Sequence, residues 1–133
     1  MTQKRFLSNL LSKNKRAVII GSLGTISYDL AEIPHKNKIL VKGAMGCVLG
    51  VGLGFALKTK KQVYVLIGDG ALLMKLGSLA TIKKYNQQNL HIIVMDNGRH
   101  ESTGGQLTNF REIEKYIKPL CEVVKVNEIH DKI

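Results

Sequence analysis

The chain has 133 residues, which suffices for one hydrophobic core and leaves no room for a second, so we expect a single domain over residues 1–133. An apolar content of 44% is ordinary for a globular protein and excludes a disordered chain. Cys47 and Cys121 are too few for a disulfide scaffold, and they favour a reducing, cytoplasmic location.

The formal net charge of +10 is compatible with nucleic-acid binding. The lysines are scattered along the chain, however, and aromatic residues make up only 5%, which is poor for base stacking. A lysine-rich solvated surface, or attraction of an acidic partner or a polyanionic substrate, explains the charge better. The longest apolar run, residues 43–57, is too short to cross a bilayer, which takes about 20 residues.

Helical and strand-like patterns alternate from the start of the chain. In chain order, the first half predicts a helix at 2–15, a strand at 17–20, a helix capped by Ser27 at 28–32, a strand at 39–41 and a helix at 47–58. Gly46, Gly50 and Gly54 lie four residues apart, and we expect them to let the last helix closely approach the sheet or a partner.

The second half continues the alternation. It predicts a strand at 62–67, a helix at 71–85, a strand at 90–95, a glycine-rich loop at 101–107, a helix at 110–117 and a strand at 122–126. This order indicates an α/β fold with an open, mostly parallel sheet and helices on both faces. Ligands of such sheets bind where the strands end. The turns after Ile20, Val41, Ile67 and Met95 would all lie at that edge.

Two of these turns carry the most informative residues. Gly68-Asp69-Gly70 follows one buried strand, and Asn97 follows the next, with 26 residues between Gly70 and Asn97. A right-handed βαβ crossover places both strand ends at one edge, roughly 5 Å apart, so the Asp69 carboxylate and the Asn97 amide can reach one small cation. Backbone N–H groups at the start of the following helix favour an anionic group there. A helix N-cap is the alternative role for Asp69.

These residues resemble the magnesium–diphosphate signature of thiamine-diphosphate enzymes. The segments GDGALLMKLGSLATI and DNGRHESTGGQLT are most similar to phosphonopyruvate decarboxylase and to the β subunit of sulfopyruvate decarboxylase, over about residues 16–126. The resemblance implies thiamine diphosphate and Mg²⁺ as cofactors. It implies Asp69, Asn97 and the backbone carbonyl of Arg99 as metal ligands, and it implies that Gly68, Gly70 and Ala71 lie along the diphosphate.

The resemblance also implies roles for two other turns. In Gly43-Ala44-Met45-Gly46, the Met45 side chain would wedge beneath the cofactor, while the Met45 N–H and the Gly43 carbonyl bind its aminopyrimidine; a core methionine is the alternative. Gly24, Thr25 and Ser27 could contact the diphosphate or could form a plain turn with an N-cap.

His100 is the candidate catalytic residue in the loop His100–Gln106. It could transfer a proton or hold an anionic substrate group, and an exposed loop histidine is the alternative.

The resemblance implies that a separate pyrimidine-binding subunit supplies an activating glutamate, so we expect an obligate hetero-oligomer that is inert as an isolated chain. The family continues through another helix and strand after residue 126, so the sheet is expected to be C-terminally truncated or finished by a partner. The expected function is decarboxylation of a small anionic 2-oxo acid, phosphonopyruvate or sulfopyruvate. An acetolactate-synthase-like carboligase subunit and a non-catalytic relic or cofactor-binding module are the alternatives.

Overall fold

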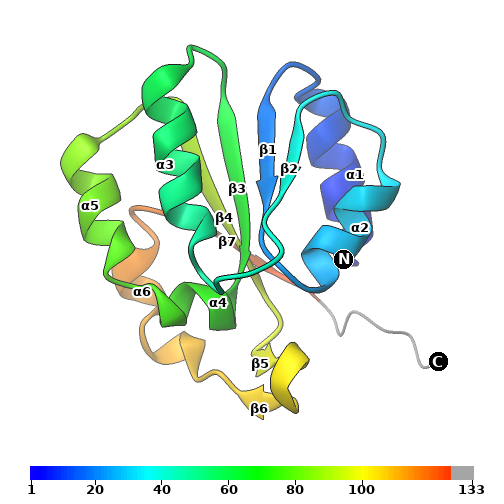
Figure 1. Cartoon of the computed structure of the whole chain (residues 1–133). Helices are drawn as coiled ribbons and strands as arrows, with labels where there is room; N and C mark the ends of the chain where they lie inside the picture. Colours follow the sequence, from blue (N-terminus) through cyan, green and yellow to red (C-terminus); the bar gives the residue numbers. More distant parts are fainter. Residues whose placement is uncertain (127–133) are drawn as a thin grey trace.

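The computed structural model describes residues 1–126, which form a five-stranded parallel sheet with helices on both faces (Figure 1). The strands, in chain order, are β1 (Val18–Gly21), β2 (Lys38–Leu40), β3 (Val63–Gly68), β4 (Leu90–Asp96) and β7 (Glu122–Lys125). The spatial order β2-β1-β3-β4-β7 confirms the predicted open α/β sheet. Because β2 and β3 lie on opposite sides of β1, the strand order reverses there, and such a reversal opens a crevice for ligands.

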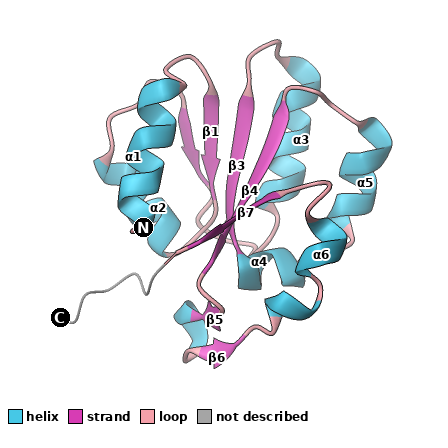
Figure 2. Ribbon diagram, turned by 180° about the vertical axis from the view of Figure 1, so that it is seen from behind, coloured by secondary structure: helices cyan, strands magenta, loops and turns pink. Residues whose placement is uncertain are grey.

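The helices divide between the two faces of the sheet. Helices α1 (Gln3–Lys13) and α2 (Thr25–Glu32) cover one face, and α3 (Val48–Lys58), α4 (Asp69–Met74), α5 (Ser78–Tyr85) and α6 (Glu114–Ile117) cover the other (Figure 2). A small antiparallel hairpin of β5 (Arg99–His100) and β6 (Gln106–Leu107) extends beyond the end of β4, with a 3₁₀ turn at Glu101–Thr103 between them. A second 3₁₀ turn, Phe110–Glu112, precedes α6.

Alternation along the strands divides the core into two layers. Val63, Val65 and Ile67 of β3 face α3 and α5, whereas Leu66 of the same strand packs with Leu7 and other residues of α1 and α2. Both layers are apolar, because each face of a parallel sheet is covered by helices. This double burial explains why the strands read as near-continuous β-branched runs.

The prediction of one continuous helix at 71–85 is wrong, because the helix is interrupted in its middle. The structure has two helices, α4 and α5, separated by a turn in which the Ser78 N–H donates to the Lys75 carbonyl at 2.9 Å. The apolar spacing runs through the break, but Gly77 has low helix propensity. The turn lets α4 remain at the end of β3 while α5 packs beside α3.

Three further local predictions need correction. Ser27 is not an N-cap: α2 begins at Thr25 with Gly24 as its cap, and the buried Ser27 hydroxyl donates to the Ser22 carbonyl at 2.6 Å. Residues 110–117 form a 3₁₀ turn and one turn of α-helix, and residues 101–107 fold into most of the hairpin. The close approach of α3 to the sheet comes from Gly52, where an added Cβ would lie 2.1 Å from Val65, whereas Gly50 and Gly54 have open space outside them.

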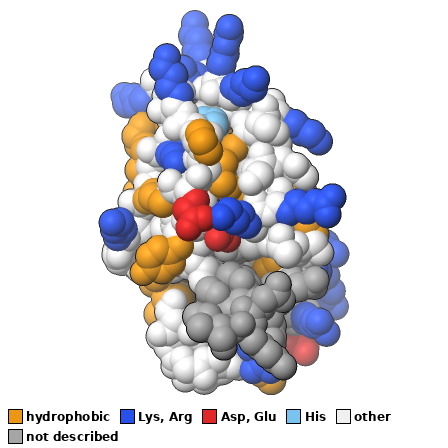
Figure 3. Space-filling model, turned by 90° about the vertical axis from the view of Figure 1, so that its right-hand side faces the viewer, with side chains coloured by type: hydrophobic (Ala, Val, Ile, Leu, Met, Phe, Trp, Pro, Cys, Tyr) orange, Lys and Arg blue, Asp and Glu red, His pale blue; other side chains and the backbone are white. Residues whose placement is uncertain are grey.

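One group of basic residues lies away from the edge where the strands end, while others, such as Lys75 and Arg99, lie near that edge. Lys15, Arg16, Lys60 and Lys61 line a surface hollow at the opposite edge, and Figure 3 shows Lys and Arg side chains gathered at that end of the molecule. Within residues 1–126, none of the helices combines the length and apolar character that a membrane crossing requires. The predicted continuation of the sheet after Val126 falls outside the described residues.

Candidate functional site

A cleft lies at the C-terminal ends of β1, β3 and β4, at the reversal in strand order. Turns after all three strands and the β5–β6 hairpin contribute to its wall. Its lining includes nearly all of the predicted site residues: Gly24, Thr25, Met45, Gly68, Asp69, Gly70, Ala71, Asn97, Arg99 and His100. Gly43 and Ser27 are the exceptions, since neither is among the lining residues. Four separate segments of the sequence thus meet at one place, as the parallel topology predicted.

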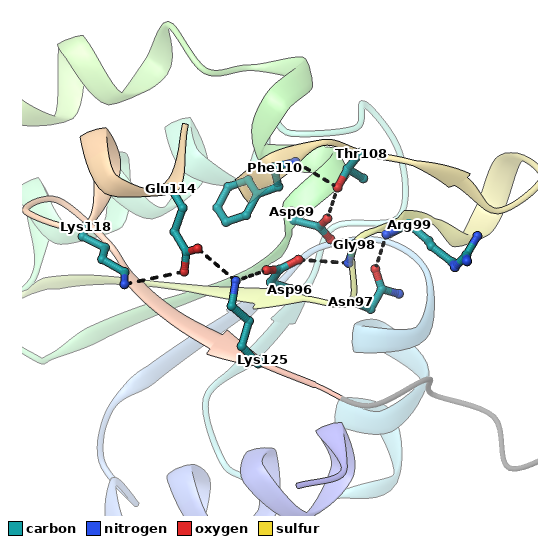
Figure 4. A network of polar contacts seen from close by, with 10 residues as sticks. All are labelled: Asp69, Asp96, Asn97, Gly98, Arg99, Thr108, Phe110, Glu114, Lys118 and Lys125. Atoms are coloured by element: carbon teal, nitrogen blue, oxygen red, sulfur yellow. Dashed lines mark hydrogen bonds and ion pairs between the residues drawn. The ribbon is translucent and has the colours of Figure 1, made fainter. Parts of the chain in front are cut away.

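Asp69 is the buried carboxylate at the centre of this site, with 2% of its surface exposed. It is the first residue of α4, whose N-cap is Gly68, so the alternative in which Asp69 itself is the N-cap is wrong. Its Oδ2 accepts a hydrogen bond from the Thr108 hydroxyl at 2.5 Å (Figure 4). Burial raises the pKa of the Asp69 carboxyl, and Asp96 raises it further, against the opposing effects of Thr108 and of the Asp69 and Asn97 backbone.

Asn97 follows β4 directly and turns its side chain back onto its own loop. Its Oδ1 accepts the Arg99 N–H at 3.0 Å, and its Nδ2 donates to Glu101 at 3.1 Å. This orientation leaves the amide oxygen with a second lone pair, because a carbonyl oxygen has two. The Arg99 side chain is used within the hairpin, where it donates to the Gly105 carbonyl at 2.9 Å.

His100 lies directly against the start of α4. A Cβ added at Gly70 would be 2.6 Å from His100 Nδ1 and 2.9 Å from its Cε1. Packing therefore explains why residue 70 is a glycine, since the His100 imidazole occupies the space that a side chain would need. This contact places a half-buried histidine beside Asp69 in the same cleft, rather than on an exposed loop.

The two remaining turns approach the cleft from either side. Gly46 has φ +86°, and an added Cβ would meet the Ala71 carbonyl at 2.7 Å, which brings the turn containing Met45 against α4. Gly24 also has a positive φ, +88°, and an added Cβ would lie 3.4 Å from the Ser102 hydroxyl. The β1–α2 turn and the hairpin therefore lie close together where both line the cleft.

Asp96, the neighbour of Asn97, is not among the residues that line the cleft and belongs to a network of ion pairs (Figure 4). Its carboxylate pairs with Lys125 and accepts the Gly98 N–H at 2.9 Å, while Lys125 also contacts Glu114 at 3.1 Å. Burial lowers the pKa of Lys125, but Asp96 and Glu114 together raise it above its ordinary value. The network joins β4, α6 and β7, so we assign Asp96 a structural role.

Sequence reasoning missed several residues of the site, of which three make informative contacts or lie far from the predicted turns. Thr108 contacts Asp69, Met95 lines the cleft, and the buried Gln3 donates to Asp29 at 2.8 Å while also lining the cleft. Gln3 lies on the face of α1 that packs against α2. A polar residue on a buried helix face was the signal in the sequence that could have marked Gln3 as a site residue. A single hydroxyl such as Thr108 leaves no pattern in the sequence.

The donor set fits a magnesium ion paired with an anionic ligand. Mg²⁺ commonly takes one or two protein side-chain oxygens and completes six-fold coordination with phosphate and water oxygens. Asp69 and Asn97 supply such oxygens at adjacent strand ends. Among residues 1–126 there is no group of three or more His, Cys, Asp or Glu suited to a metal. A cation held here would therefore take most of its oxygens from amide groups, the backbone or a bound ligand.

Comparison with curated proteins gives relatives of two kinds. The chain is 43% identical over 104 residues to phosphonopyruvate decarboxylase of Streptomyces viridochromogenes, covering 77% of this chain and 26% of the relative. It is 34% identical over 119 residues to sulfopyruvate decarboxylase subunit beta of Methanocaldococcus jannaschii, covering 84% and 62%. The β subunit of Methanococcus maripaludis is 31% identical over 134 residues, covering 99% and 72%. The chain thus spans about a quarter of the first relative and less than two thirds of the second.

Two solved structures illustrate the fold that this chain shares with known proteins. A putative thiamin diphosphate-dependent enzyme from Mycobacterium smegmatis matches with TM-score 0.63 and 18% identity, covering 98% of this chain and 32% of the other. A 2-oxoglutarate:ferredoxin oxidoreductase from Magnetococcus marinus matches with TM-score 0.58 and 22% identity, covering 71% and 32%. At these identities the matches show the shared fold.

A family model identifies the domain directly. Residues 20–127 match the thiamine pyrophosphate enzyme, C-terminal TPP binding domain, and this span includes the turns after β1, β3 and β4 that form the cleft. The family match and the named relatives confirm the resemblance stated from the sequence. The chain belongs to the thiamine pyrophosphate enzyme family and carries its C-terminal TPP-binding domain.

Proposed function

We propose that this chain is the diphosphate-binding subunit of a thiamine-diphosphate-dependent decarboxylase of small anionic 2-oxo acids. The observation that carries the proposal is the meeting of Asp69 and Asn97 at adjacent strand ends in one cleft, beside the turns that belong to the matched domain. Thiamine diphosphate, when bound, supplies the electron sink that decarboxylation of a 2-oxo acid requires. The chain's own residues hold and orient that cofactor.

Specific roles follow from where the side chains lie. Asp69 and Asn97, with the Arg99 carbonyl, would hold Mg²⁺, and the cation would neutralise diphosphate oxygens lying along Gly68, Gly70 and Ala71. Gly24 and Thr25 approach the same cleft from the β1 side. Met45 lines the same cleft, where its apolar side chain would support a ring system. Gly43, which is outside the lining, would contribute its backbone carbonyl from the same turn.

His100 is the residue we assign to the substrate side of the cleft. Its imidazole is held against Gly70, within the lining that also contains Asp69 and Arg99. A histidine there can donate a proton or hold an anionic substrate group at neutral pH. Phosphonopyruvate and sulfopyruvate each carry a second anionic group besides the carboxylate, and relatives of this chain are named for both substrates.

A second subunit is part of the proposal. The cleft has a volume of about 70 Å³, whereas sites that enclose a drug-sized ligand have roughly 300–1,000 Å³. The small volume supports the proposal that this chain would hold only part of the cofactor, while a pyrimidine-binding subunit would cover the rest and supply the activating glutamate. Relatives named subunit beta favour the same arrangement.

The test is copurification followed by substrate screening. We expect a tagged chain, purified from its native organism in Mg²⁺ and thiamine diphosphate, to retain a pyrimidine-binding subunit and to release CO₂ from phosphonopyruvate or sulfopyruvate. The isolated chain should be inactive with both. An assembled complex that turns over neither compound would refute the substrate, and formation of an acetolactate-type product would replace the decarboxylase with a carboligase. Decarboxylation by the isolated chain would refute the need for a partner.

A further inference from the structure

Thr108 contacts both strand ends that carry the proposed metal ligands. Its hydroxyl donates to Asp69 Oδ2 at 2.5 Å, although the two residues are 39 positions apart in the sequence. Its backbone N–H donates to the Gly98 carbonyl at 3.0 Å, one residue beyond Asn97. Thr108 is itself buried, with 7% of its surface exposed. One residue after the hairpin therefore joins the turn after β3 to the turn after β4.

A further contact fixes the direction of the Thr108 hydroxyl. The Phe110 N–H donates to Thr108 Oγ1 at 3.4 Å, so this oxygen acts as an acceptor on that side. A threonine hydroxyl has only one proton to donate, and here that proton goes to Asp69. Its branched Cβ restricts χ1 and keeps the hydroxyl in place. A carboxylate has about four acceptor positions, so Asp69 retains capacity for a cation while this bond holds it.

We propose that Thr108 is a positioning residue that orients the Asp69 carboxylate for cation binding. The inference rests on the proposed metal role of Asp69 and adds a residue outside the metal-ligand motif. Hydrogen-bond partners of metal ligands typically change metal affinity about 10–100-fold when they are removed. Because Thr108 directly follows β6, the same bond couples docking of the β5–β6 hairpin to the geometry of the cation site.

The experiment measures Mn²⁺ affinity of the native assembly with thiamine diphosphate present, by the electron paramagnetic resonance signal of free Mn²⁺. Thr108→Val removes the hydroxyl and keeps the shape of the side chain, and Thr108→Ser keeps the hydroxyl. Asn89→Ala is the matched control, because the Asn89 amide donates to three backbone carbonyls at the opposite edge of the sheet, including that of Ala56 at 3.1 Å. Asp69→Ala gives the reference for a lost ligand.

We expect Thr108→Val to weaken Mn²⁺ binding about 10–100-fold, Thr108→Ser to remain within about threefold of wild type, and Asn89→Ala to lower stability while affinity is unchanged. Equal affinity of the Val and Ser variants would overturn the inference while leaving Asp69 as a ligand. If Asp69→Ala binds Mn²⁺ as wild type does, the metal role of Asp69 fails, and the Thr108 inference fails with it. Should the Val variant not fold, Thr108→Ala against Thr108→Ser gives the same comparison.

Discussion

An added methyl group at Gly70 tests the contact on which the arrangement of the cleft depends. The new Cβ would lie 2.6 Å from His100 Nδ1, well inside van der Waals contact. Gly70 is also the second residue of α4, where alanine is favoured over glycine by up to about 1 kcal/mol. Two opposing effects therefore act in Gly70→Ala: a gain from helix propensity and a loss from overpacking, which costs about 1–3 kcal/mol.

The size of the loss from overpacking depends on whether the His100 side chain can move away from the new methyl group. Its ring is half-buried and ends a side chain that can rotate, so we expect the overpacking cost near its lower limit, about 1 kcal/mol. Gly70→Ala should then leave the free energy of unfolding nearly unchanged, while the imidazole is displaced from the cleft. In a His100→Ala background no ring opposes the methyl group, and Gly70→Ala should raise the free energy of unfolding by up to about 1 kcal/mol.

A double-mutant cycle isolates this contact. Urea denaturation of wild type, the two single variants and the double variant should give a coupling of about 1 kcal/mol. The His100 imidazole resonances in NMR spectra should also shift in Gly70→Ala. A coupling below about 0.3–0.5 kcal/mol, the range found for independent sites, would show that His100 does not lie on Gly70.

Three other predictions concern burial. Because burial raises the pKa of Asp69, its charged form is disfavoured in the metal-free fold, and Asp69→Asn should raise stability at pH 7. This gain should shrink as the pH falls through the raised pKa, where the folded wild type takes up its proton; urea denaturation at neutral and at acidic pH checks both expectations. Burial raises the pKa of Cys121 to about 11, so Ellman's reagent at pH 8 should modify the half-exposed Cys47 first and Cys121 only on unfolding. Gly52→Ala forces a Cβ to within 2.1 Å of Val65 and should lower the free energy of unfolding by about 1–3 kcal/mol, whereas Gly50→Ala on the open side should not.

The central strands of the main sheet were predictable because they have strong local signals, whereas the short strands β5 and β6 were predicted as a loop. The β-branched runs before Gly21 and Gly68 and before Asn97 are buried on both faces, and the turns that follow them meet at one edge by topology. The same logic placed Asp69 and Asn97 in one cleft. Confirmation of that arrangement required only the parallel pairing of β3 with β4.

What the sequence did not reveal depends on contacts between distant residues. The break after Met74 follows from how α4 packs at the end of β3, which the apolar spacing does not encode. The bond from Thr108 to Asp69 spans 39 positions and depends on how the hairpin folds back over α4. The glycine that approaches the sheet, Gly52, lies between the regularly spaced glycines that suggested a packing stripe.

The measurement that tests the central claim most directly is the binding of thiamine diphosphate to the native assembly by equilibrium dialysis, with and without Mg²⁺. We expect one cofactor per chain, bound only with Mg²⁺, and an affinity loss of more than about tenfold in Asp69→Ala and in Asn97→Ala, with Asn89→Ala unchanged. Mg²⁺-independent binding, or binding that neither cleft variant weakens, would contradict the assignment of this strand edge as the diphosphate site.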